Sequence, residues 1–270
     1  MGAKQKACVH CLRVTDTTKD HVFPFSWYPD NTPASVQRWT APSCRRCNEK
    51  FGALETDLLV RLIGCVDPSE VAAAGLHDKA SRSLGIGVQE ELPEEEKAKR
   101  AALKAKIISE FVPATDVANL PGRIPGLGPS DETAGTVILF PLAAFSMMTE
   151  KIARGCEYNF HKKRRLVEPP YSVVTTLSES KPQPLPENWK PSCHHFDFGP
   201  GCKITRVCFP EDDPNAVLYW ILIWNTLCMR AWIDLEENFK GVEIEKFPGI
   251  ELSLGTKIMN VPAYLRAFKE

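Results

Sequence analysis

Two CxxC pairs near the N-terminus constrain this chain more than any other feature. Cys8 and Cys11 form the first pair, in "ACVHC", and Cys44 and Cys47 form the second, in "SCRRC". The two-residue spacer allows a tight turn to point both sulfurs of a pair at one ion, and four thiolates suit a closed tetrahedral zinc site. The spacing therefore predicts a small zinc-stabilised unit whose metal contributes directly to folding. The alternative is four unrelated buried cysteines.

The N-terminal residues indicate a compartment in which such cysteines bind metal. "MGAKQKACVHC" has basic residues but no apolar stretch after them, so we expect no signal peptide and a cytoplasmic location. In a reducing compartment, paired cysteines more often bind metal than form disulfides. The formal net charge is −1, so any nucleic-acid surface must be a local patch.

The composition along the chain changes twice, which predicts an α+β protein in three parts. Residues 1–64 contain both cysteine pairs and end in a helical pattern of Phe51, Leu54, Leu58, Leu59 and Leu62. Residues 65–135 form a connecting region, with a charged helix after Pro93 and then a Gly/Pro-rich loop. Residues 136–270 read as a mixed α/β domain of unknown role, with a helix after Pro141 and several strands.

One segment of the third part is apolar enough to raise the question of whether it spans a membrane. Residues 216–233, "AVLYWILIWNTLCMRAWI", are nearly apolar and of borderline length for a spanning helix. Asn225, Thr226 and Arg230 interrupt the segment, and its β-branched and aromatic residues favour two buried strands with a turn at Asn225-Thr226. We therefore expect core strands and no membrane association.

Between the cysteine pairs, an Asp-His dipeptide lies in the apolar stretch "TKDHVFPFSWYPD". Asp20 and His21 project to opposite faces of a strand unless the backbone twists. Asn48 follows the fourth cysteine directly and is either an N-cap of the helix or a ligand. A carboxylate and an amide oxygen, completed by water, suit Mg²⁺ or Mn²⁺.

Taken together, "CVHC…KDHVFP…CRRCNEKFGALE" resembles the HNH nucleases, also called the ββα-metal or His-Me finger family, in the branch with a structural zinc. The resemblance covers about residues 8–60. It implies a treble-clef-like ββα-metal domain in which Cys8, Cys11, Cys44 and Cys47 hold zinc. It also implies that His21 is the general base and that Asp20 and Asn48 hold a catalytic Mg²⁺ or Mn²⁺.

The sequence departs from the family pattern at the middle asparagine, which orients the base. Asn31 is the only Asn between His21 and Cys44, and its placement matches weakly. Glu55 fits the branch pattern as a further metal-associated residue, and it is equally well explained as a solvated helix residue. We expect His10, inside the first CxxC pair, to be a surface residue.

Basic residues and a second Cys/His cluster give weaker indications. Arg45 and Arg46 lie between the cysteines of the second pair and are candidate phosphate contacts. A second candidate is the cluster Lys162, Lys163, Arg164 and Arg165. This cluster is equally well explained as a solvated loop. The segment "SCHHFDFGPGC" presents Cys193, His194, His195 and Cys202 as a candidate second metal site, but adjacent histidines in a strand point to opposite faces, which disfavours it.

Two functions follow as expectations. The first is a metal-dependent HNH endonuclease that hydrolyses phosphodiester bonds in nucleic acid, with DNA as the first expectation. The C-terminal domain would then supply substrate choice, regulation or homo-oligomerisation. The second is a catalytically inactive, zinc-stabilised module that binds nucleic acid or a protein partner. The presence of Asp20, His21 and Asn48 favours the enzyme, because a scaffold requires only the cysteines.

Overall fold

The N-terminal part is a β-hairpin followed directly by a helix. The structure, a computed structural model, describes residues 5–64, 66–67, 69–87, 92–113, 136–138, 142–162, 172–179, 192–209, 213–234, 250–254 and 257–260. Strand β2 (Val14–His21) pairs antiparallel with β3 (Thr40–Cys44), β1 (Gln5–Ala7) extends the sheet beside β2, and α1 (Arg45–Ile63) begins where β3 ends. A short 3-10 helix, η1 (Phe25–Trp27), lies in the loop between β2 and β3.

Helix α1 forms where the sequence places apolar residues at helical spacing. Phe51, Leu58 and Leu62 are buried, and the helix ends before Gly64 as expected. Its N-cap is Cys44. The alternative interpretation of Asn48 as the N-cap is therefore wrong, because the helix begins three residues earlier and Asn48 lies within its first turns.

The connecting region contributes helices on the outside of the molecule. It contains η2 (Val71–Ala73), α2 (Leu76–Ser83) and α3 (Glu94–Ser109), followed by β4 (Phe111–Pro113), which pairs with β5 (Thr136–Ile138). The expected helix after Pro93 is confirmed as α3, whose exposed ion pair Lys99–Glu95 is typical of a solvated face. The expected Gly/Pro-rich loop lies outside the described residues.

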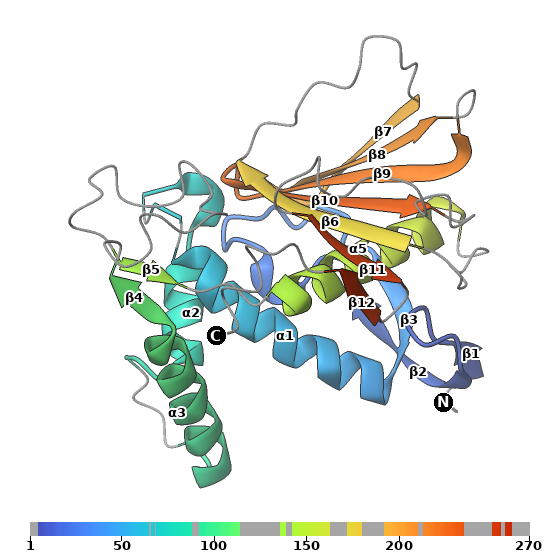
Figure 1. The fold of residues 1–270 in the computed structure, drawn as a ribbon. Coiled ribbons are helices and arrows are strands. Elements are labelled where there is room, and N and C mark those ends of the chain that lie inside the picture. Colours follow the sequence, from blue (N-terminus) through green and yellow to red (C-terminus); the bar gives the residue numbers. More distant parts are fainter. Residues whose placement is uncertain are drawn as a thin grey trace.

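The C-terminal half is built on an antiparallel sheet, which within the described residues has seven strands in the order β12-β11-β6-β10-β9-β8-β7 (Figure 1). Its strands are β6 (Ser172–Glu179), β7 (Ser192–Asp197), β8 (Lys203–Phe209), β9 (Asp213–Ile223), β10 (Leu227–Asp234), β11 (Ile250–Leu254) and β12 (Lys257–Asn260). The molecule is thus a mixed α+β protein, as the sequence predicts.

The apolar segment at residues 216–233 forms two strands of this sheet. Strands β9 and β10 pair antiparallel around a turn in which Trp224 and Asn225 have φ values of 48° and 55°. Asn225 adopts this left-handed conformation more easily than most residues. The predicted strand–turn–strand is confirmed, and none of the described helices is long and apolar enough to cross a membrane.

Helix α5 (Leu142–Phe160) joins the two halves. It lies between the large sheet and the unit formed by β2, β3 and α1 (Figure 1). A single hydrophobic core runs through this helix, from Phe23 and Leu58 on one side to Ile152 within it and Tyr219 on the sheet. Because α5 packs on both sides, it places side chains of the C-terminal half directly against the Asp-His strand. The predicted boundaries at residues 64 and 135 stay a prediction.

Candidate functional site

The four cysteines of the two CxxC pairs come together at one point. All their sulfur atoms lie within 4.8 Å of one another, with Cys8 and Cys11 from the turn after β1 and Cys44 and Cys47 from the start of α1. In the first turn, the Leu12 N–H donates to the Cys8 carbonyl at 2.8 Å, and Leu12 adopts a φ of 63°. This tight turn is what the two-residue spacer predicts.

The donor set fits a structural metal such as zinc. A zinc–sulfur bond of about 2.3 Å implies a sulfur–sulfur separation of about 3.8 Å in a tetrahedron, and the Cys11 and Cys44 sulfurs are 3.8 Å apart. Burial acts to raise the pKa of Cys8, but backbone N–H groups, among them that of Cys44 at 3.3 Å, lower it to about 7. Thiolate is the form that binds metal.

Asp20 lies on the buried side of the hairpin, where both of its carboxylate oxygens have protein partners. Its Oδ2 is 3.3 Å from His10 Nε2, and its Oδ1 accepts a hydrogen bond from Lys151 Nζ at 3.1 Å. The same ammonium group donates to the Glu55 carboxylate on α1. One lysine from α5 therefore joins two carboxylates from β2 and α1.

In this cluster the pKa values of the two acids, Asp20 and Glu55, shift in opposite directions. Burial acts to raise the pKa of Asp20, but the His10 hydrogen bond and the positive charge of Lys151 leave it lower than usual. The pKa of Glu55 is raised because burial outweighs the attraction of Lys151. Glu55 is thus a member of a partly buried ionic cluster. The interpretation of Glu55 as a solvated helix residue is wrong.

Helix α5 directs several polar side chains to the hairpin. Arg154 Nη1 donates to the His10 carbonyl at 2.8 Å, and Asn159 Nδ2 donates to the Thr40 carbonyl at 3.2 Å. With Lys151, these residues recur at helical spacing on one side of α5. Lys151 and Arg154 were not predicted as site residues from the sequence. The available signal was a set of charged residues at this spacing within an otherwise apolar helix.

His10 is buried, which corrects the expectation of a surface residue. Only 9% of the residue is exposed, and its ring lies 4.6 Å from the ring of Phe51, centroid to centroid. Burial lowers its pKa, so the imidazole is neutral near pH 7. Its position inside the first CxxC pair links the cysteine cluster to Asp20.

His21 ends β2 and faces the opposite side of the strand from Asp20, as strand alternation predicts. It is half-buried and packs beside Phe25, and its Nδ1 is buried without a hydrogen-bond partner. Burial lowers its pKa and outweighs the negative charge of Asp20, which acts to raise it, and the positive charges of Lys151 and Arg38 lower it further. A neutral imidazole is suited to accept a proton, and since Nδ1 is buried the proton would be taken up by Nε2.

Asn48 and Asn31 do not take the positions that the resemblance implies. Asn48 Nδ2 donates to the Thr18 hydroxyl at 3.4 Å and is not a hydrogen-bond partner of Asp20. Asn31 Nδ2 donates to the Val71 carbonyl at 3.1 Å and so does not orient His21. With both oxygens of Asp20 engaged by protein groups, Asp20 and Asn48 as arranged do not fit a divalent ion.

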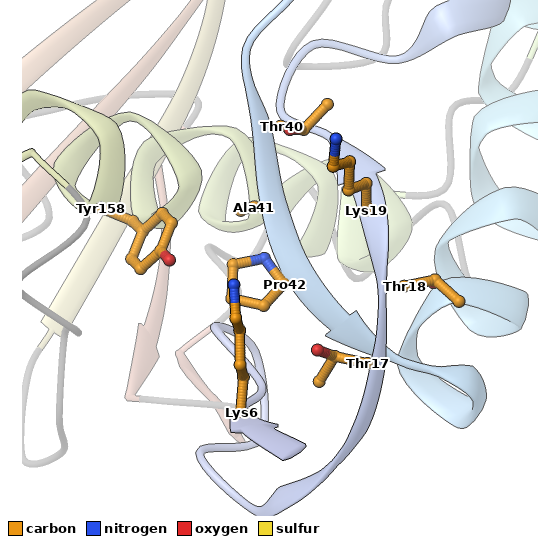
Figure 2. Close-up of a pocket in the computed structure, with 8 residues that line it drawn as sticks. All are labelled: Lys6, Thr17, Thr18, Lys19, Thr40, Ala41, Pro42 and Tyr158. Carbon is orange, nitrogen blue, oxygen red and sulfur yellow. The ribbon is translucent and has the colours of Figure 1, made fainter. Parts of the chain in front are cut away.

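A groove of about 220 Å³ opens beside the hairpin between β1, β2, β3 and the end of α5 (Figure 2). Its lining consists of Lys6, Thr17, Thr18, Lys19, Thr40, Ala41, Pro42 and Tyr158. In Figure 2, the Lys6 side chain extends from β1 toward Pro42. Two lysines, three threonines and a tyrosine line the groove, and none of its lining residues is acidic.

The groove adjoins His21. Thr17, Lys19 and His21 alternate along β2 and therefore project to one side of it. Thr40, which lines the groove, is the cross-strand partner of His21 in the hairpin. Lys6 and Lys19 were not identified from the sequence, because they are separated along the chain and only the sheet brings them together.

Of the basic residues predicted from the sequence, Arg45 and Arg46 are exposed at the start of α1, where Arg45 pairs with Glu49 at 2.8 Å. Lys162 is exposed after α5, whereas residues 163–165 lie outside the described residues.

The second Cys/His segment forms a β7–β8 hairpin. There, His194 packs on Phe160 and His195 contacts Thr205, and within the described part of the chain only the four N-terminal cysteines form a metal-binding cluster.

Comparison of the chain with protein-family models, with curated proteins and with solved structures gives no match in any of the three.

Proposed function

We propose that this protein binds the backbone of a nucleic acid in the groove beside the β2–β3 hairpin and hydrolyses a phosphodiester bond with His21 as the general base. The observation that carries the proposal is the position of His21. It lies half-exposed at the end of β2, on the strand face that also bears Lys19. The strand–strand–helix order and the cysteine cluster support the resemblance to HNH nucleases.

His21 has the properties that a general base requires. Because its pKa is lowered, the imidazole is unprotonated at neutral pH and can accept a proton from water that attacks a phosphate. Arg38 provides positive charge near this residue, Lys19 lies two residues before it on the same strand face, and positive charge stabilises a phosphorane-like transition state. Phe25 packs against the ring and restricts its orientation.

The groove supplies a surface that suits a phosphate backbone. Lys6 and Lys19 offer ammonium donors, and the Thr17, Thr40 and Tyr158 hydroxyl groups are further hydrogen-bond donors. Such contacts position a nucleic acid without reading its sequence. Both DNA and RNA carry this backbone, and DNA is our first choice of substrate.

Two metals enter the proposal differently. Zinc at Cys8, Cys11, Cys44 and Cys47 would hold the hairpin on α1, as the sulfur positions support. The resemblance also implies Mg²⁺ or Mn²⁺ at Asp20 and Asn48. No step proposed for His21 passes through that ion, because the oxygens of Asp20 are bound by His10 and Lys151.

The test is cleavage of supercoiled plasmid, single-stranded DNA, branched DNA and RNA by the full chain, with and without Mg²⁺ or Mn²⁺. We expect wild type to cleave at least one substrate and His21→Ala to lose about 100-fold or more of the rate, as for removal of a general base. The control is His195→Ala, an exposed histidine on β7. Equal cleavage by wild type and His21→Ala would disprove the role of His21.

A second candidate function is nucleic-acid binding without cleavage. It is favoured by the buried ion pairs that bind Asp20 to Lys151 and so remove it from solvent. In that case wild type and His21→Ala bind nucleic acid equally and neither cleaves any of the four substrates. Lys19→Gln would then still weaken binding, because the groove serves both functions.

A further inference from the structure

The ammonium group of Lys151 occupies a point on which two carboxylates converge. Its Nζ lies 3.1 Å from Asp20 Oδ1 and also contacts the Glu55 carboxylate. The Lys151 side chain is 1% exposed, although lysine is almost never fully buried unless it is paired. The contact spans 131 residues of sequence, so it forms only when α5 packs against the hairpin.

Without Lys151, the cluster would not be electrically balanced. Asp20 and Glu55 lie on one side of the hairpin with little exposure to water, and two carboxylates near one another repel. Arg154 is directed to the His10 carbonyl and to Glu150. Lys151 therefore provides the positive charge that both acids share.

A point shared by two carboxylates is also where proteins bind hard divalent cations. The resemblance to HNH nucleases implies such an ion at Asp20, whereas the contacts place the end of a lysine side chain there. We propose that Lys151 is a built-in cation that takes the place of a divalent ion at Asp20 and Glu55. The native protein accordingly binds no divalent ion through Asp20. This inference goes beyond the proposed hydrolysis and does not rest on it.

The proposal makes a specific statement about substitution at Lys151. A neutral side chain of similar length, as in Lys151→Met, leaves two carboxylates facing a space without a cation. This is the ligand set that Mg²⁺ and Mn²⁺ prefer. A positive side chain, as in Lys151→Arg, keeps the charge and leaves no such space.

The test is titration of the purified full chain with Mn²⁺, with free Mn²⁺ measured by electron paramagnetic resonance. Zinc bound to four thiolates is not displaced, because Mn²⁺ binds such ligands more weakly than Zn²⁺. We expect Lys151→Met to bind about one Mn²⁺ at least tenfold more tightly than wild type, in line with the removal of a competing cation. Asp20→Asn in the Lys151→Met background should abolish that site.

Two controls separate this effect from a general loss of positive charge. Lys151→Arg should bind Mn²⁺ no better than wild type. Lys106→Met removes an exposed lysine that pairs with Asp57 at 3.3 Å, and it should gain no site. A folded Lys151→Met protein without the new Mn²⁺ site would overturn the proposal.

Wild type and the single variant Asp20→Asn provide a second decisive measurement, which serves even if Lys151→Met does not fold. If wild type binds Mn²⁺ and Asp20→Asn abolishes that binding, Lys151 does not take the place of the ion and the proposal is wrong. No nucleic acid is present in these titrations. The outcome is therefore distinguishable from failure of the proposed hydrolysis, which the cleavage assay tests with His21→Ala.

Discussion

Gly155 of α5 lies directly against Val22, the residue that follows His21. A Cβ atom built on Gly155 would lie 2.8 Å from Val22 Cγ2, closer than real side-chain contacts allow. The absence of a side chain at this one position lets α5 approach the end of β2. The approach brings Lys151, one helical turn earlier, to Asp20.

We predict that Gly155→Ala destabilises the protein, whereas Gly52→Ala does not. Alanine favours helix by about 1 kcal/mol over glycine, and a Cβ atom added to the exposed Gly52 in α1 would have no atom within 4 Å. At Gly155, overpacking against Val22 should outweigh that gain and cost about 1–3 kcal/mol. Urea unfolding of both variants measures the difference.

The double variant Gly155→Ala/Val22→Ala tests the cause of this effect. Removing the two methyl groups of Val22 creates space for the new Cβ atom, so the two changes should be less destabilising together than the sum of the single changes. Additive effects would show that Gly155 matters for a reason other than its contact with Val22.

Loss of one clustered cysteine should remove the metal and unfold the N-terminal unit. We expect wild type to contain about one zinc per chain and Cys44→Ser to contain little, because a closed structural site requires four ligands. Cys193→Ser, at an exposed cysteine outside the cluster, should keep its zinc and its circular dichroism spectrum. Mass spectrometry measures the zinc content of each protein. Full zinc retention in Cys44→Ser would contradict the assignment of the four cysteines as zinc ligands.

Lys6→Gln and Lys19→Gln should weaken binding to duplex DNA and reduce its salt dependence. Each phosphate contact that is lost lowers the slope of log K against log salt by about 0.9. Lys99→Gln on α3, whose lysine is exposed and pairs with Glu95, is the matched control and should leave the slope unchanged. Fluorescence anisotropy at several salt concentrations gives the slopes. An unchanged slope in both groove variants would show that the DNA backbone does not bind in this groove.

Glu157 should make stability depend on pH in the acidic range. Burial acts to raise its pKa, but Arg206 at 2.6 Å and the Tyr219 hydroxyl at 2.5 Å lower it below the usual value of 4.5. A folded-state pKa below the unfolded one stabilises the fold above about pH 4.5, and this stabilisation is lost as the pH falls through the folded-state pKa.

The corresponding variant is Glu157→Gln, which leaves the buried Arg206 without its carboxylate. We expect a loss of about 3–5 kcal/mol in the free energy of unfolding near pH 7. The curves of wild type and variant should converge as the pH falls, because protonated Glu157 resembles glutamine. Glu95→Gln, in an exposed pair, should have little effect at any pH. A constant difference between wild type and Glu157→Gln across this range would contradict this role of Glu157.

Helices and strands such as α1, β9 and β10 could be predicted from the sequence, because each depends on the pattern of its own residues. Residues 45–63 carry apolar side chains at helical spacing, and residues 216–233 combine β-branched residues with a turn-forming Asn-Thr, so each element follows from its own residues. The cysteine cluster was predictable as well, since its geometry is determined by the two CxxC spacers and the chemistry of thiolates.

The surroundings of Asp20 were not predictable in this way. Lys151 and Arg154 reach the hairpin because α5 packs between the two halves, and no local pattern specifies which helix covers Asp20. His10 was misjudged for the same reason, because the side chains that bury it come from α1 and α5. Residues of one motif can be found by spacing, whereas their partners are determined by tertiary packing.

His10 has a final consequence for the protein as a whole. It lies between Cys8 and Cys11, its ring contacts Asp20, and its carbonyl accepts a hydrogen bond from Arg154. We therefore expect metal occupancy at the cysteines to be thermodynamically linked to the docking of α5, although the cysteines and α5 lie far apart in the sequence. A chelator that strips the cysteines should expose the amides of α5 to hydrogen exchange, and zinc restored to the protein should protect them again.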